Sequence, residues 1–83
     1  MAASGFTWGS GFTCGNFDEC QMKKRVIERA AKVIMLMDST KYGKSMPFTF
    51  ATLTEIDMLI TDDKIPQEVP DELLKQKIET ILR

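Results

Sequence analysis

The sequence predicts an α/β fold with a partial parallel sheet. Two short apolar runs, within Val33–Met37 and Asp57–Asp63, each end in hydroxyl and carboxylate side chains, and a helical pattern precedes the first run. Continuous apolar runs are typical of strands that are covered on both faces, as in parallel sheets. In open sheets of this kind, ligands bind outside the carboxyl ends of the strands. We therefore expect the binding chemistry at Asp38–Lys44, and the alternative is an ordinary turn.

Length and charge exclude several function classes. The 83 residues suffice for one small domain, and a net charge of −1 gives no basic surface. Binding of DNA, RNA or an anionic membrane by this segment is therefore not expected. The chain has no histidine, so it lacks the commonest general base and the commonest transition-metal ligand. Enzymes built on histidine are excluded, and no metal or cofactor is expected.

The two cysteines predict free thiols. Cys14 and Cys20 are separated by five residues, which fits neither a redox C-x-x-C motif nor a zinc site with four ligands. The sequence shows no signal-peptide pattern and no apolar run long enough to span a membrane. We therefore expect two reduced cysteines in a cytoplasmic protein.

The N-terminal segment, Met1–Gly15, is predicted to be a tight, partly ordered loop. It contains four glycines and a short echo, in which Ser4–Thr7 recurs as Ser10–Thr13. We interpret this echo as a coincidence between two turns, because glycines are common in turns. The aromatic side chains in this loop could have one of three roles: a small satellite core, a subunit contact or a lid over a ligand. They are Phe6, Trp8 and Phe12.

A helix is predicted over Phe17–Ala31. Asn16 and Glu19 form an N-cap and capping-box signature at its start. Apolar residues recur at helical spacing along this segment. They are Met22, Val26, Ile27, Ala30 and Ala31.

The second half of the chain predicts short strands and turns. Phe48–Ala51 follows Pro47 and alternates in polarity, which indicates a brief edge-like strand. Thr52 and Glu55 form a second capping box, for which only one helical turn is available. The apolar run within Asp57–Asp63 follows. If this strand and Val33–Met37 are parallel, then Asp38 and Asp62 lie at the same edge of the sheet.

The last segment is open to two interpretations. Pro70, with the acids after it, indicates the first turn of a helix. From Leu73 to Arg83 the apolar spacing slightly favours a helix, but Ile78–Leu82 also fits a terminal strand.

Five segments match motifs of one known protein family. Asp38–Gly43 is similar to a D-S-S-K-F-G signature and Ile56–Asp62 to an I-D-x-L-I-T-D strand, and these two most specific matches occur in the family's order. The weaker matches are Gly5–Phe6, Gly11–Thr13 and the helix at Asn16–Ala30. Together these segments resemble the C-terminal half of the effector-sensing domain of DeoR-type bacterial transcriptional repressors.

The resemblance implies a fold related to ribose-5-phosphate isomerase, glucosamine-6-phosphate deaminase and the CoA transferases, and a role in sensing phosphorylated sugars. A sugar phosphate requires cationic or N–H donors for its phosphate and acceptors for its hydroxyls. Lys41, Lys44 and the loop amides are the expected donors, and Asp38 and Asp62 the expected acceptors. The expected ligand-binding residues are Asp38, Ser39, Thr40, Lys41, Gly43, Lys44 and Asp62.

The sequence differs from the family pattern at several positions and lacks two segments of the family. Gln21 stands where many relatives carry an acid, and Lys77 stands where relatives often place a helix-ending glycine. The resemblance favours a strand for the tail. Such repressors also carry an N-terminal winged helix-turn-helix and an early glycine-rich loop, neither of which is in this sequence. Residues 1–83 are therefore expected to be a single incomplete effector-sensing domain that forms half of a pocket, and DNA is contacted only through the absent domain.

Two alternatives remain at this level. A partial sheet leaves a strand edge and a hydrophobic face uncovered, so self-association is expected. The segment could then mainly supply an oligomer interface, with Phe6, Trp8, Phe12 and the methionine-rich strand within Val33–Met37 as contacts. The other alternative is a fragment of a sugar-phosphate isomerase or deaminase, in which Asp38 or Asp62 would act as the base.

Overall fold

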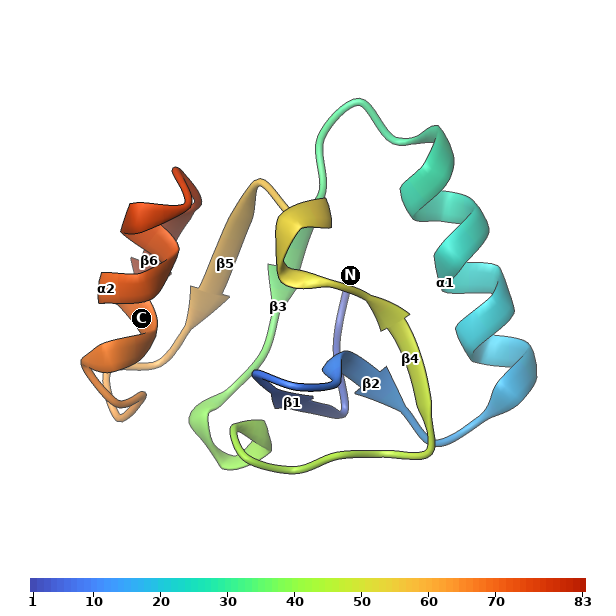
Figure 1. Ribbon diagram of the computed structural model, residues 1–83, viewed down its shortest axis with the longest axis horizontal. Coiled ribbons are helices and arrows are strands. Elements are labelled where there is room, and N and C mark those ends of the chain that lie inside the picture. Colours follow the sequence, from blue (N-terminus) through green and yellow to red (C-terminus); the bar gives the residue numbers. More distant parts are fainter.

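Two three-stranded sheets form the centre of the molecule, with one helix at each end (Figure 1). The structure is a computed structural model that describes all residues, 1–83. The antiparallel sheet has the order β1-β2-β4, with β1 at Gly5–Thr7, β2 at Gly11–Cys14 and β4 at Phe48–Ala51. The parallel sheet has the order β3-β5-β6, with β3 at Ile34–Leu36, β5 at Met58–Thr61 and β6 at Glu79–Leu82. Helix α1 spans Phe17–Arg29 and helix α2 spans Glu68–Lys75, and two short 3-10 turns, η1 and η2, occupy Ser39–Lys41 and Leu53–Glu55.

The N-terminal segment is a β-hairpin, so the prediction of a loop was wrong. The two copies of the echo are strands β1 and β2, which pair antiparallel with Phe6 opposite Phe12. The two rings lie 4.7 Å apart and are buried in the one hydrophobic core, not in a satellite. Trp8, in the turn between the strands, is 45% exposed. Sequence reasoning missed the hairpin because each strand is very short and begins with glycine, a residue that is depleted in strands.

Helix α1 confirms the predicted helix, but it ends at Arg29 instead of Ala31. Its first turn is capped as expected, since the Glu19 N–H donates to Asn16 Oδ1 at 2.9 Å. Its predicted apolar stripe is only partly covered, because Ile27 is buried while Met22 and Val26 remain exposed.

The parallel sheet confirms the predicted pairing of the two apolar runs. Strands β3 and β5 run side by side in the same direction, with Met35 opposite Leu59 (Figure 1). Met35 and Leu59 are almost completely buried, whereas Ile34 and Leu36, on the other face, are 38% and 45% exposed. The prediction that both faces are covered was therefore wrong. The uncovered hydrophobic face expected of a partial sheet is present instead.

The remaining short elements agree with the predictions. β4 pairs only with β2 and lies at a sheet edge, and η2 is a single turn. The tail forms β6, parallel to β5, which decides between the two interpretations in favour of a strand. Lys77 precedes it with a φ of 61°, the left-handed conformation for which glycine is favoured.

The cysteines are both free, as predicted, and both are buried. Cys14 ends β2, and the Cys20 thiol in the first turns of α1 donates to the Thr49 carbonyl at 3.2 Å. No helix of the structure combines the length and the apolar character needed to cross a membrane.

Candidate functional site

The carboxyl ends of β3 and β5 meet at one edge of the parallel sheet, as the sequence predicts. Asp62 follows β5 and reaches the loop that follows β3, where its Oδ2 accepts the Ser39 N–H at 2.9 Å. Its other oxygen accepts the Lys64 N–H, also at 2.9 Å. Asp62 therefore fastens the start of the loop to the neighbouring strand.

Asp38 shapes the same loop from within. Its Oδ1 accepts the Thr40 N–H at 2.9 Å and also the Thr40 hydroxyl, so that Asp38 caps the turn η1. The hydrogen bond from the Thr40 hydroxyl lowers the pKa of Asp38, and that from the Ser39 N–H lowers the pKa of Asp62. Both carboxylates are therefore ionised at neutral pH, and each is already engaged with donors of the loop.

The loop amides are not free to bind a ligand, in contrast to the prediction. Every N–H from Ser39 to Lys44 donates within the protein. The acceptors are, in order, Asp62 Oδ2, Asp38 Oδ1, the Asp38 carbonyl, the Ser39 carbonyl, the Phe6 carbonyl and the Lys41 carbonyl. The short 3-10 turn brings its own carbonyls and caps within reach of these donors. An anion at this loop must therefore be held by side chains.

Lys41 and Lys44 are the basic residues of the loop. The one ion pair of the structure joins Lys23 to Glu19 at 3.0 Å, so these two lysines, like the other basic side chains, have no carboxylate partner. Lys41 lies at the end of η1 and is partly exposed, and Lys44 is exposed. These two ammonium groups are the cations that the loop offers to an anion, and the Ser39 side chain lies beside Asp62.

Glycines fix the end of the loop. Gly43 has a φ of 85°, and its N–H donates to the Phe6 carbonyl in β1 at 2.8 Å. The chain then passes so close to Gly5 that a Cβ atom there would lie 2.4 Å from the Lys44 carbonyl oxygen. Gly43 thus contributes its conformation, and Gly5 contributes the space for the loop to lie on β1.

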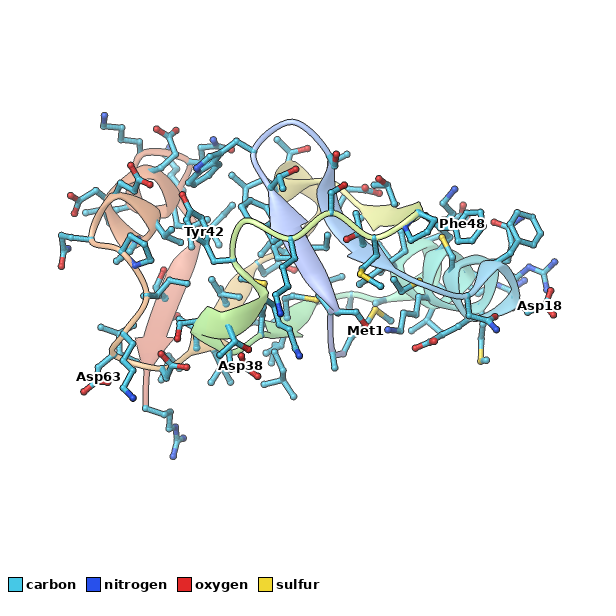
Figure 2. All side chains as sticks on the ribbon, turned by 90° about the horizontal axis from the view of Figure 1, so that it is seen from below. Met1, Asp18, Asp38, Tyr42, Phe48 and Asp63 are labelled. Carbon is cyan, nitrogen blue, oxygen red and sulfur yellow. The ribbon has the colours of Figure 1, made fainter.

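Tyr42 is a residue of the site that sequence reasoning missed. Its hydroxyl accepts the indole N–H of Trp8 at 2.9 Å and donates to Glu68 Oε1 at 2.6 Å. The hydrogen bond to Glu68 raises the pKa of Tyr42. Figure 2 shows Tyr42 and Asp38 on opposite sides of the η1 turn. The sequence signal was a tyrosine where the D-S-S-K-F-G signature has phenylalanine.

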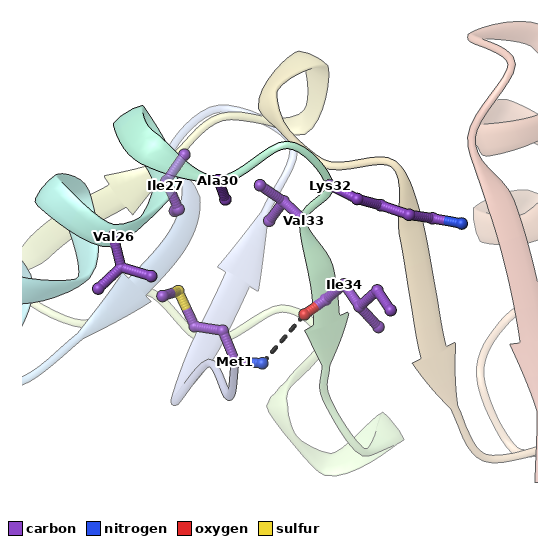
Figure 3. Close-up of a pocket in the computed structure, with 7 residues that line it drawn as sticks. All are labelled: Met1, Val26, Ile27, Ala30, Lys32, Val33 and Ile34. Atoms are coloured by element: carbon purple, nitrogen blue, oxygen red, sulfur yellow. Dashed lines mark hydrogen bonds between the residues drawn. The ribbon is translucent and has the colours of Figure 1, made fainter.

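The surface hollows of the structure lie elsewhere. None of them is lined by Asp38–Lys44 or by Asp62. The most apolar hollow, of about 270 Å³, lies between α1 and β3 (Figure 3). Its lining residues are Met1, Val26, Ile27, Ala30, Lys32, Val33 and Ile34. The loop therefore stands on the surface and does not enclose a cavity by itself.

Comparison with known proteins identifies the family of this chain. The model of the DeoR C-terminal sensor domain matches residues 1–63, which include both strand ends and the loop between them. The chain belongs to the DeoR sensor-domain family. The match ends before α2 and β6.

Relatives of this DeoR sensor-domain chain include several helix-turn-helix (HTH) transcriptional regulators. It is 41% identical over 64 residues to the HTH-type transcriptional regulator GlpR of Haloferax volcanii, which covers 77% of the chain and 25% of that protein. It is 40% identical over 65 residues to the regulator GolR of Listeria innocua, and this match covers 78% of the chain and 26% of GolR. It is 36% identical over 64 residues to the repressor GlcR of Bacillus subtilis, and this match covers 77% of the chain and 24% of GlcR.

Two conclusions follow from these matches. The chain spans about a quarter of the length of these relatives. The relatives are named as transcriptional regulators and repressors, so the predictions of a regulator's sensor domain and of a protein that is not an enzyme are confirmed.

Proposed function

We propose that this chain is the effector-binding segment of a DeoR-type transcriptional regulator of sugar metabolism and that its effector is a phosphorylated sugar. The carrying observation is the loop at the carboxyl edge of β3 and β5, where Lys41 and Lys44 have no carboxylate partner. Two unpaired cations at a ligand-binding edge suit a phosphate dianion. A regulator of this kind works in the cytoplasm.

The chemistry of the loop divides between the two parts of such a ligand. Lys41, Lys44 and the Ser39 hydroxyl would hold the phosphate. Asp38 would accept sugar hydroxyls through Oδ2, which accepts no hydrogen bond in the structure. Asp62 would contribute through its remaining lone pairs, since each carboxylate oxygen can accept two hydrogen bonds.

The proposal also includes the complete sensor domain and the DNA-binding domain of the regulator. Residues 1–83 would form an incomplete part of the sensor domain, whose complete fold is related to ribose-5-phosphate isomerase, glucosamine-6-phosphate deaminase and the CoA transferases. The parallel order β3-β5-β6 supports this relation. DNA would be bound by a winged helix-turn-helix outside this chain. Effector binding would shift the quaternary arrangement and hence the affinity for DNA.

An NMR titration tests the proposal. Amide spectra of the isotope-labelled chain are recorded with pentose and hexose phosphates, with the matched unphosphorylated sugars and with inorganic phosphate. We expect saturable changes centred on residues 39–44 and Asp62 from the sugar phosphates and, at lower affinity, from inorganic phosphate, and none from the unphosphorylated sugars. Lys41→Ala should weaken the binding about tenfold, because a hydrogen bond to a charged group contributes about 1.5 kcal/mol or more.

The control is Lys75→Ala, which removes the same charge from α2. It should leave the affinity unchanged. An unaltered affinity of the Lys41→Ala variant would remove Lys41 from the site, and changes centred away from the loop would contradict the proposal as a whole.

A second candidate function is supported by one observation. The exposed Ile34 and Leu36 on the sheet favour an oligomerisation surface. The isomerase or deaminase alternative is not retained, because the relatives are regulators.

A further inference from the structure

Tyr42 connects three parts of the molecule that are distant in the sequence. It follows η1 directly, Trp8 lies in the turn between β1 and β2, and Glu68 is the first residue of α2. The direction of the two hydrogen bonds is fixed, because an ionised carboxylate only accepts and an indole N–H only donates. The Tyr42 hydroxyl must therefore donate to Glu68 and accept from Trp8.

The backbone and the ring of Tyr42 are held as firmly as its hydroxyl. Its backbone forms a bridge with Phe6, and the next residue, Gly43, donates to the Phe6 carbonyl. Its ring stacks on that of Phe6, with a centroid distance of 6.3 Å and an interplanar angle of 25°. Phe6 is only 2% exposed. Tyr42 is thus a fixed point between the hairpin and the loop.

The same residue is also part of the turn that carries Lys41. The Tyr42 N–H donates to the Ser39 carbonyl at 3.2 Å, which closes η1. Ser39 is in turn held by Asp62. Ser39 and Lys41 are therefore joined to Tyr42 through one hydrogen-bonded turn.

We propose that Tyr42 is a positioning residue of the loop, and that the Trp8–Tyr42–Glu68 hydrogen-bond chain couples occupancy of Asp38–Lys44 to the hairpin turn and to the start of α2. This inference rests on the proposed function. It assigns to α2, which lies beyond the residues matched by the family model, the role of responding to the ligand.

The chain contains a natural reporter for this coupling. Trp8 is its one tryptophan, and the indole N–H is bonded to Tyr42. Indole emission is therefore expected to follow any change at the Tyr42 hydroxyl. Tyr42→Phe keeps the ring that packs on Phe6 and removes only the hydroxyl, so the variant should fold.

The test combines Trp8 emission with the amide spectra, using inorganic phosphate and ribose 5-phosphate as probes. In the unmodified chain, emission should change with the same midpoint as the Lys41 amide. In Tyr42→Phe, the Lys41 amide should respond with a lower affinity, because the loop loses a positioning contact, while the emission change at saturation falls at least fivefold. Emission that stays constant while the Lys41 amide responds, or a Tyr42→Phe variant that behaves like the unmodified chain, overturns the coupling.

A measurement without ligand separates this inference from the proposed function. Glu68→Ala, which removes the acceptor of the Tyr42 hydroxyl, should displace the amide resonances of Thr40 and Lys41. Glu72→Ala, one turn further along α2 and not bonded to Tyr42, should not displace them. If no probe affects the loop, the proposed function fails. If Glu68→Ala leaves both loop amides in place, the coupling fails, whatever the probes do.

Discussion

At the scale of single residues, some residues of the site build the loop after β3, and others remain available to a ligand. Asp62 uses one oxygen for the Ser39 N–H and the other for the Lys64 N–H. Asp38 caps η1, and Gly43 supplies a positive φ. These three residues build the loop, and the two lysines remain unpaired on it. The conformation of the loop is therefore complete without a ligand, which reduces the ordering cost of binding.

Gly5 gives the prediction that belongs to this scale. Gly5→Ala would place a methyl group 2.4 Å from the Lys44 carbonyl oxygen and 2.9 Å from Thr13 Oγ1. The backbone on both sides must shift, so we expect a loss of about 1–3 kcal/mol in the free energy of unfolding, as for other overpacked sites. Chemical denaturation followed by circular dichroism measures this loss.

The matched control is Gly9→Ala, in the turn of the same hairpin. A Cβ atom at Gly9 would have no neighbour within 4 Å. Its effect should stay within about 0.5 kcal/mol, as for most surface substitutions. Equal effects of the two substitutions would show that the close approach at Gly5 carries no strain.

At the scale of elements, the site is a junction between β5 and the loop after β3. The sequence was sufficient to predict this junction, because the two apolar runs and the acids after them are local patterns. It was not sufficient for the hairpin, since the pairing of Phe6 with Phe12 and of β2 with β4 depends on contacts between distant residues. The sequence also could not show that the loop amides are hydrogen-bonded within the protein, because their acceptors include Asp62 and the Phe6 carbonyl, which are distant in the sequence.

Acid should loosen this junction. The folded state lowers the pKa values of Asp38 and Asp62 below their usual value of about 3.9. A lowered pKa contributes stability that is present above the usual value and is lost as pH falls through the folded-state value. The free energy of unfolding should therefore decline below about pH 4, and the amide signals of Ser39 and Lys64 should shift in the same range.

Asp62→Asn should flatten this decline, because the variant cannot be protonated and its side chain has one acceptor oxygen instead of two. Asp63→Asn serves as the control, since it changes the neighbouring aspartate in the same way but Asp63 accepts no hydrogen bond in the structure. A decline that is the same in the unmodified chain and in Asp62→Asn would show that Asp62 does not stabilise the junction.

At the scale of the whole molecule, the exposed face of the parallel sheet distinguishes this chain from a closed domain. The register places Leu36 beside Ile60 and Ile60 beside Ile81, and Ile34 lies on the same face. Ile34 and Leu36 are exposed, and Ile60 and Ile81 are partly exposed. The apolar runs alone predicted strands covered on both faces. The missing cover could not be read from them, because what packs on a strand is not encoded in its own sequence.

Self-association is the expected consequence of this face. A contiguous apolar patch on a sheet is stabilised when it is removed from water. Size-exclusion chromatography with light scattering should therefore show a dimer or a larger species that dissociates on dilution. Leu36→Lys should weaken the association about tenfold or more, because full burial of a leucine side chain contributes about 1.5–3 kcal/mol.

Leu74→Lys is the matched control for this experiment. Leu74 is 76% exposed on α2, so the substitution adds the same charge to an exposed leucine away from the sheet face. Because both leucines are exposed in the single chain, both variants should keep the circular dichroism spectrum of the fold. If Leu74→Lys weakens the association as much as Leu36→Lys, the contact is not made by the sheet face. A stable monomer of the unmodified chain at every concentration tested would show that the exposed face alone does not drive assembly, and the second candidate function would then be discarded.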